Sequence, residues 1–166
     1  SAAAAVAALV ATSAAYYFGA QLGFQLRFPD SPHSVLWPPN AILLAAFMLM
    51  PTRLWPWCVL SVLPAHVAIS LPAGVPWLAL FGFYVTNTAQ AVLGAALFKA
   101  FTVRHGIESA HVRTITFIAS GVFISPIILS FADVAVAIWT GWSTNTYWQA
   151  WSLRFLSNAA SAAIIV

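Results

Sequence analysis

Apolar residues occur in long runs along this chain, separated by short polar or proline-rich stretches. A helix needs about 20 mostly apolar residues to cross a bilayer, and six runs approach that length. Most of them are apolar all round, which is typical of helices that face lipid as well as protein. The predicted spans cover residues 3–26, 37–50, 55–71, 77–101, 115–139 and 148–166.

Helix breakers support this division. Pro29 and Pro32 fall between the first two runs, Pro51 ends the second, and segment 72–76 contains two prolines and a glycine. The second run is short for a span, roughly 20 Å at the standard helical rise. We therefore predict an all-α fold, a polytopic transmembrane helical bundle of about six spans in which the second helix is short.

Composition excludes an ordinary soluble domain. The chain is 62% hydrophobic and 5% charged, with a mean hydropathy of +0.91, whereas soluble domains carry about 25% charged residues. A transmembrane β-barrel would require alternation with period two. The net charge of +3 comes from few charges, so it does not indicate nucleic acid as a partner. The lipid bilayer is the partner that composition predicts.

Tryptophans gather near the predicted helix ends. Amphipathic rings at these positions form the aromatic belt expected at the headgroup level of a membrane. The predicted interface anchors are Trp37, Trp55, Trp57, Trp77, Trp139 and Trp148.

The distribution of basic residues predicts the orientation. The loops after the second and fourth spans, with their flanks, hold Arg53, Lys99, Arg104 and Arg113. The opposite loops hold only Arg27, with Arg154 just inside the sixth span. The positive-inside rule then places both termini in the cytoplasm. Three cations around the fourth loop are too few to define a lipid-binding patch, and we interpret them as ordinary positive-inside residues.

Two charged residues lie within predicted spans. Charge inside a bilayer is costly, so such residues are candidates for function. Asp133 in the fifth span and Arg154 in the sixth span lie at similar depths, measured from the same side of the membrane. They are therefore candidates for a polar latch between two helices. Three interpretations are open. The pair is a purely structural clamp, or it is opened by an anionic or polar ligand that competes for Arg154, or Asp133 faces an aqueous crevice.

Uncharged polar residues form a second candidate set. Asn87 and Gln90 lie near the centre of the fourth span and Asn158 near the centre of the sixth. An amide cannot remain unpaired in hydrocarbon without cost. These side chains either join helices, at about 0.6 kcal/mol per contact, or line a binding cavity.

Segment 37–40, with the sequence WPPN, is the most distinctive motif. Pro38 and Pro39 preset the first turn of a helix and donate no hydrogen bonds. Asn40 is then placed to satisfy freed backbone amides. A short helix entered through such a turn leaves room for a cavity near one membrane face, so Asn40 is a ligand candidate.

His66 lies in the third span, two residues after Pro64. It is either a packing residue or one that contacts a ligand or responds to pH. A haem would need a second axial ligand at matching depth, and the other histidines fall in loops. The lone Cys58 excludes an internal disulfide and an all-cysteine metal site. No catalytic motif is present, so we predict no enzyme, no catalytic residue, no metal and no cofactor.

Several motifs together resemble a known family. Segment 37–46, WPPNAILLAA, resembles the W-P-P-x-(G/A)-I-x-L-A-A signature of the bacterial membrane-associated sensor type-one domain, the MASE class. Segments 53–56 (RLWP) and 64–66 (PAH), the N-x-x-Q pattern at 87–90, and W-x-x-R-x-x-S-N at 151–158 resemble further family motifs in the same order.

The resemblance implies a sensory module of the bacterial inner membrane, fused to or associated with a cytoplasmic histidine kinase, diguanylate cyclase or phosphodiesterase domain. We expect one integral membrane domain over residues 1–166, truncated or lacking its output domain. Two other functions stay open: a non-catalytic accessory subunit that packs against other membrane subunits, and a small-solute-binding component of a transporter.

Overall fold

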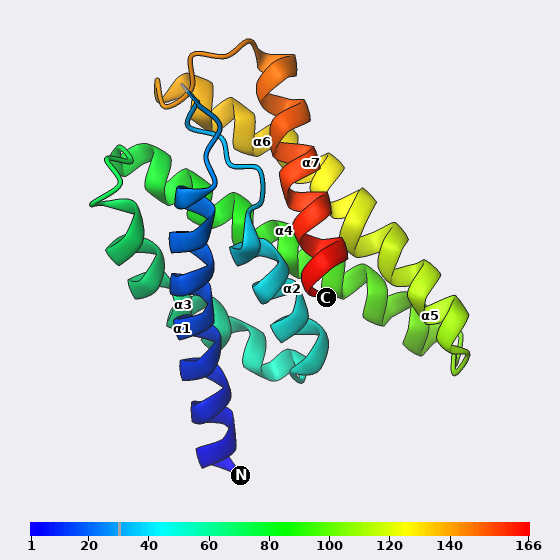
Figure 1. Ribbon diagram of the computed structural model, residues 1–166. Coiled ribbons are helices and arrows are strands. Elements are labelled where there is room, and N and C mark those ends of the chain that lie inside the picture. The colour runs from blue at the N-terminus through cyan, green and yellow to red at the C-terminus, as the bar shows by residue number, and fades with distance from the viewer. Residues whose placement is uncertain (30) are drawn as a thin grey trace.

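The computed structural model describes residues 1–29 and 31–166, and every regular element in them is a helix (Figure 1). This confirms the predicted all-α bundle. The elements are α1 (Ala2–Gln25), α2 (Pro38–Leu49), the 3-10 turn η1 (Thr52–Leu54), α3 (Trp55–Ser70), α4 (Trp77–Arg104), α5 (Ala110–Phe117), the π-helix η2 (Ile118–Ile124), α6 (Ser125–Trp139) and α7 (Tyr147–Ile165).

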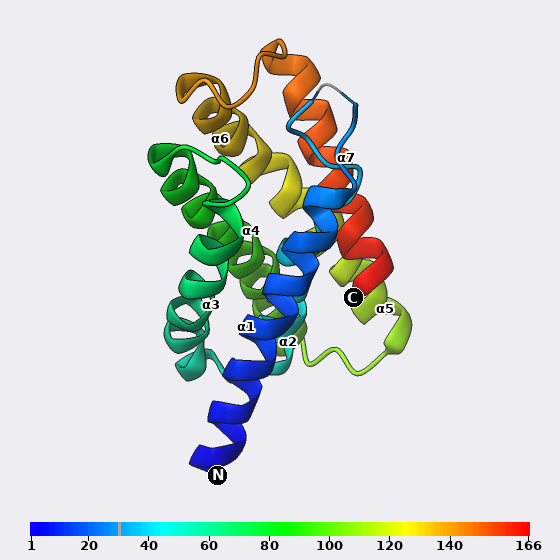
Figure 2. The same ribbon diagram turned by 60° about the vertical axis from the view of Figure 1, so that its left-hand side comes forward.

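Successive helices run in alternating directions along the bundle when α5, η2 and α6, which follow one another without a break, are taken as one helix (Figures 1 and 2). The N-terminus, the turn between α2 and α3, and the loop between α4 and α5 lie at one end. We call this the basic end, because Arg53, Lys99, Arg104 and Arg113 lie there. The described parts of the loop 26–37 (residues 26–29 and 31–37) form the opposite end together with the loops at 71–76 and 140–146.

Three helical stretches are long and apolar enough to cross a membrane: α1, α4 and the stretch Ala110–Trp139. The 28 residues of α4 correspond to about 42 Å at the standard rise. As predicted, α2 is short, with 12 residues, and it begins with Pro38 and Pro39 at the two positions where a missing amide does no harm.

The fourth loop is shorter than the sequence predicts. We expected a connection over 102–114, but α4 continues to Arg104 and α5 begins at Ala110. Hydropathy detects where lipid ends, whereas a helix can continue for further turns into the polar region. Gly106, with φ +55°, closes α4 in a conformation that glycine adopts without strain.

The short helix α2 occupies the centre of the bundle and packs against α1, α4 and α7. Its buried residues Leu43, Leu44 and Phe47 join the main apolar core, together with Tyr16 of α1 and Val62 of α3. Fully buried apolar side chains hold α2 in place although it is too short to cross a bilayer alone.

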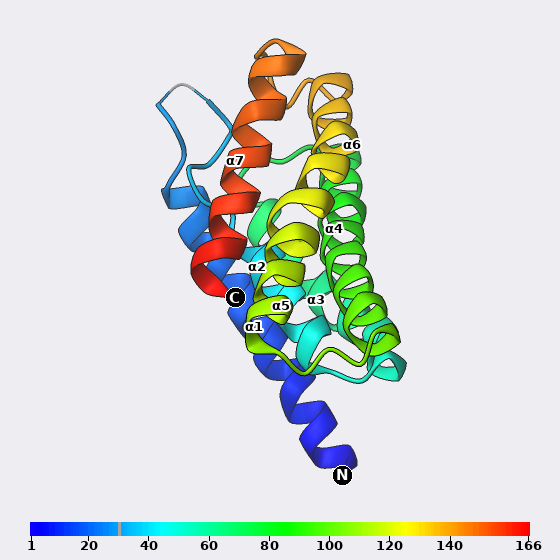
Figure 3. The ribbon, with the colours of Figure 1, turned by 90° about the vertical axis from the view of Figure 1, so that its right-hand side faces the viewer.

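Glycines allow α4 to lie close to the neighbouring helix. A side chain at Gly82 would collide with Val136 of α6, and one at Gly94 would come within 2.9 Å of the Ser125 hydroxyl. The Cα of Gly121, in η2, also lies beside Gly94. Small residues at helix contacts are the usual means of close packing in membranes. Figure 3 shows α4 running alongside the continuous helix formed by α5, η2 and α6.

Candidate functional site

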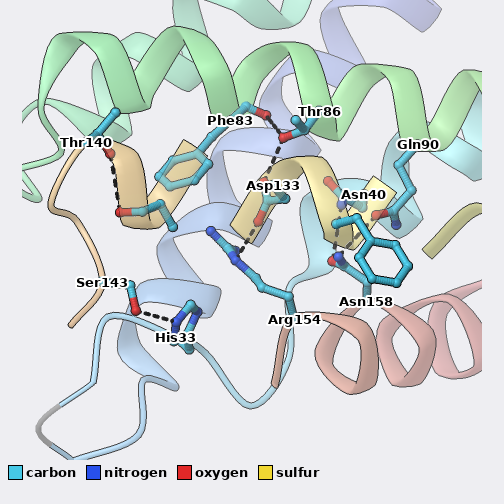
Figure 4. A network of polar contacts seen from close by, with 12 residues as sticks. His33, Asn40, Phe83, Thr86, Gln90, Asp133, Thr140, Ser143, Arg154 and Asn158 are labelled. Atoms are coloured by element: carbon cyan, nitrogen blue, oxygen red, sulfur yellow. Dashed lines mark hydrogen bonds and ion pairs between the residues drawn. The ribbon is translucent and has the colours of Figure 1, made fainter. Parts of the chain in front are cut away.

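The charged pair predicted from depth is in contact. Arg154 Nε of α7 lies 2.6 Å from Asp133 Oδ2 of α6, and the Thr86 hydroxyl of α4 donates a 2.7 Å hydrogen bond to Asp133 Oδ1. Figure 4 shows these three side chains converging from three helices. We call this set the charged rung.

Both charges of this rung are buried. Asp133 is 4% exposed and Arg154 is 8% exposed. The Arg154 guanidinium also lies over the ring of Phe83, 4.9 Å from its centroid, and 5.9 Å from that of Trp37. Two charges removed from water are tolerated only when each compensates the other, so the pair and its aromatic neighbours form one electrostatic unit.

An amide rung lies one helical turn away. Asn40 Nδ2 of α2 donates to Asn158 Oδ1 of α7 at 3.1 Å, and Asn158 Nδ2 donates to Gln90 Oε1 of α4 at 3.1 Å. All three residues are buried. Asn158 therefore ties α7 to two helices at once, which is the joining role expected for buried amides.

Asn40 differs from the expectation that it caps backbone amides. Its Oδ1 atom, the acceptor that capping requires, is buried and has no hydrogen-bond partner among the described residues. The side chain instead turns its amide nitrogen toward Asn158. The two prolines explain the difference, because they remove two of the amides that a cap would serve.

Helical spacing aligns the two rungs. Arg154 and Asn158 on α7, and Thr86 and Gln90 on α4, are each four residues apart, so each pair shares one face. The α7 face continues to Ser161, whose hydroxyl accepts a 2.7 Å hydrogen bond from the backbone amide of Trp37. We did not select Ser161 from the sequence, although it follows Arg154 by seven residues, a spacing that places both on one face of a helix.

His66 is fully engaged in hydrogen bonds. Its Nε2 lies 2.9 Å from the carbonyl oxygen of Leu80, which can only accept, so Nε2 carries the proton. Its Nδ1 is then free to accept from the Tyr16 hydroxyl, 2.9 Å away. Neither nitrogen is available to iron, and the described residues contain no group of three His, Cys, Asp or Glu that could hold a metal.

A small cavity adjoins the charged rung. Its volume is about 20 Å³, and Arg154, Asn87, His66 and Trp37 contribute to its wall. That is room for about one water molecule. Asn87 thus lines the cavity next to Arg154, whereas Gln90 and Asn158 belong to the amide rung.

A histidine joins two loops at the opposite end. His33 is buried and its Nε2 lies 3.0 Å from the Ser143 hydroxyl, between the loops 26–37 and 140–146. Burial and the nearby Arg154 charge lower the pKa of His33 to about 4. Burial also lowers the pKa of Arg27, whose guanidinium lies over the rings of Phe24 and Trp142.

The predicted tryptophan anchors fall into two groups. Four of them are between 59% and 74% exposed, as residues at a headgroup region would be: Trp57, Trp77, Trp139 and Trp148. Trp55 is half-buried and donates to the carbonyl of Phe47. Trp37 is only 6% exposed. It directly precedes α2 and packs on Gly23 and Phe24 of α1, so it lies inside the bundle.

Comparison with known proteins identifies the family. The chain matches MASE1 over residues 8–166. No curated protein and no solved structure matches it. MASE1 domains are sensory rather than catalytic, and they lie in membranes, which agrees with a bundle whose buried polar residues join helices. With nearly its whole length matched, the chain belongs to the MASE1 family of membrane sensory domains.

Proposed function

We propose that this domain perceives a stimulus at the charged rung and its cavity, and that α7 passes the change to a cytoplasmic output. The observation that carries the proposal is the ion pair between Asp133 and Arg154, which joins α6 to α7 beside a cavity. The output is a kinase or cyclase domain fused to this domain or associated with it.

The latch works through two packings of the same helices. A ligand shifts an equilibrium only by binding one packing more tightly than the other. An anionic or polar ligand that competes with Asp133 for Arg154 meets this condition, because it binds well only where the pair is open. The present cavity holds about one water, so it represents the closed packing.

The amide rung determines how α7 moves when the latch opens. Asn158 keeps its bonds to α2 and α4, one turn from Arg154. Release of Asp133 therefore frees the part of α7 near the opposite end first, while the middle of the helix stays attached. With its middle held at Asn158, α7 pivots there, and the arm beyond Asn158, which runs toward the basic end (Figure 1) and the proposed cytoplasmic side, moves in turn.

Mass spectrometry of the protein purified in mild detergent from its natural membrane tests the output. We expect an intact mass well above the 17.8 kDa of this chain, or a fixed partner, with peptides from a kinase or cyclase domain. A mass near that of this chain, with constant non-signalling membrane partners, would contradict the relay and favour the accessory subunit.

Substitution tests the latch in the same protein. We expect Asp133→Asn and Arg154→Gln to alter the basal output and its response to the stimulus in the same direction, since both open the pair. Leu156→Ala, on the exposed side of α7 (60% exposed), is the matched control and should leave the output unchanged. If both latch variants fold and signal as the unaltered protein does, the latch is wrong.

A further inference from the structure

A large apolar groove lies at the basic end, away from the polar rungs. Its volume is about 560 Å³, within the roughly 300–1,000 Å³ typical of small-molecule sites. One wall is the last part of α4 with the residue that follows it, from Leu97 to His105, and the other is formed by α5 and η2, from Val112 to Ile124. The short loop from 105 to 109 joins the two walls at the basic end.

The walls of the groove offer no free polar group along its length. Thr116 and Ser120 contribute to it, but each hydroxyl donates to a carbonyl of its own helix, those of Val112 and Thr116. The rest of the wall toward the middle of the bundle is Leu97, Ala100, Ala119 and Ile124. Such a surface suits a hydrocarbon chain and offers no hydrogen bond to a polar ligand.

The only basic side chains that line the groove lie at its basic end. Arg104 and His105 line it at the basic end, and both are exposed. Among the described residues no carboxylate lies within ion-pair distance of Arg104, although Glu108 lies in the loop that follows it. The positive charge of Arg104 is therefore left for a partner from outside the chain.

We propose that this groove binds an anionic phospholipid, with one acyl chain along the apolar wall and the phosphate at Arg104 and His105. The order of features matches such a lipid, because the cation lies at the membrane surface and the apolar wall runs toward the midplane. From the number of charges alone, we interpreted the cations around the fourth loop as ordinary positive-inside residues. The apolar groove next to Arg104 is the observation that changes this interpretation.

Lipid retention by the full chain tests the proposal. The protein is purified in mild detergent, exposed to equal amounts of phosphatidylglycerol and phosphatidylcholine, and the retained lipids are measured by native mass spectrometry. Near a membrane surface one cation is worth about 1 kcal/mol toward an anionic lipid, so we expect about a fivefold preference for phosphatidylglycerol. Arg104→Gln should reduce that preference to near one.

Two further variants separate the groove from general surface charge. Arg53→Gln removes a cation from the same end but not from the groove, and should keep the preference. Ala119→Trp fills the groove and should lower retention of both lipids, whereas Ala11→Trp, on the exposed side of α1, should not. Equal retention of the two lipids by the unaltered protein, or equal losses in the Arg53 and Arg104 variants, would overturn the proposal.

Discussion

The two ends of α4 are packed in opposite ways. Toward the end of the bundle that lies opposite the basic end, α4 lies close to α6 and α7. Thr86 and Gln90 form hydrogen bonds to these two helices, and Gly82 allows close contact with Val136. Toward the basic end, the same helix separates from α5 and leaves a groove of about 560 Å³. No hydrogen bond between side chains joins α4 to α5 among the described residues.

The difference shows what holds helices together in lipid. Lipid tails are as apolar as leucine, so burial of apolar surface gives little reason for two helices to associate. Helices in lipid associate instead through close packing at small residues and through hydrogen bonds between helices. Where α4 meets α6 and α7 it has both, and these helices pack closely; where it faces α5 no side-chain hydrogen bond joins the two helices among the described residues, and they separate.

Loss of the ion pair should weaken the closed region most. Asp133→Asn keeps the shape and the Thr86 contact but leaves Arg154 buried without a counter-charge. We expect a loss of about 3–5 kcal/mol in the free energy of unfolding, as for other buried pairs with one partner removed. Thermal or denaturant unfolding in detergent, followed by near-ultraviolet circular dichroism, measures it.

The double variant Asp133→Asn/Arg154→Gln sharpens this prediction. With both charges gone, no uncompensated ion remains, so most of the lost stability should return. If the double variant is as unstable as the sum of the two single variants, the pair makes no coupled contribution.

A larger side chain at Gly94 should push apart the closely packed helices through steric overlap. The added Cβ comes within 2.9 Å of Ser125 and 3.1 Å of Leu44, so Gly94→Val requires helices to shift. Overpacking of this kind costs about 1–3 kcal/mol. Ala100→Val, on the groove side of α4, meets open space and should change the unfolding midpoint little; equal effects would remove the contrast between the two regions.

The amide rung should contribute less than the charged rung. Asn158→Ala removes two interhelical hydrogen bonds, each worth about 0.6 kcal/mol, so we expect a loss of about 1 kcal/mol. Unfolding of this variant is compared with that of Leu156→Ala, on the exposed face of α7. A loss for Asn158→Ala as large as that for Asp133→Asn would contradict the order of the two rungs.

The smallest effect should be confined to the loops of the opposite end and depend on pH. The pKa of His33 falls from 6.5 to about 4 on folding, so the unfolded loops bind a proton that the folded loops do not. The loops are then fully stable above about pH 6.5 and lose stability as the pH falls toward 4. The protection of the amides at 26–29, 31–37 and 140–146 against hydrogen exchange, after correction for the intrinsic change of the exchange rate with pH, should decrease over that range. His33→Gln should abolish that decrease.

Much of the fold could be predicted because lipid imposes a simple rule. The boundaries of α1, α2, α3 and α7 agree with the predicted runs within one or two residues. The start of α5 differs by five residues, since Ala110–Thr114 are helical without being apolar. Apolar runs report the extent of hydrocarbon, and a helix that continues beyond the membrane surface leaves no such signal.

The candidate site could be predicted only in part. Similar depth was enough to suggest the contact between Asp133 and Arg154, because a buried charge needs a partner. Depth says nothing of rotation about a helix axis, so it did not distinguish Gln90, which joins helices, from Asn87, which lines the cavity. The hydrogen bond from Tyr16 to His66 depends on two helices meeting at one angle, which spacing within either cannot reveal.

The π-helical stretch η2 has a consequence for changes in the length of the chain. Its hydrogen bonds span five residues rather than four, so the seven residues from Ile118 to Ile124 are wound more loosely than an α-helix. Deletion of one residue there would let the stretch tighten to α geometry while α5 and α6 keep their faces. The same deletion in α4 between Thr86 and Gln90 would turn the rest of the helix by about 100° and place these two residues on different faces. Over evolution, gaps of one residue should therefore accumulate in η2 and be absent from α4.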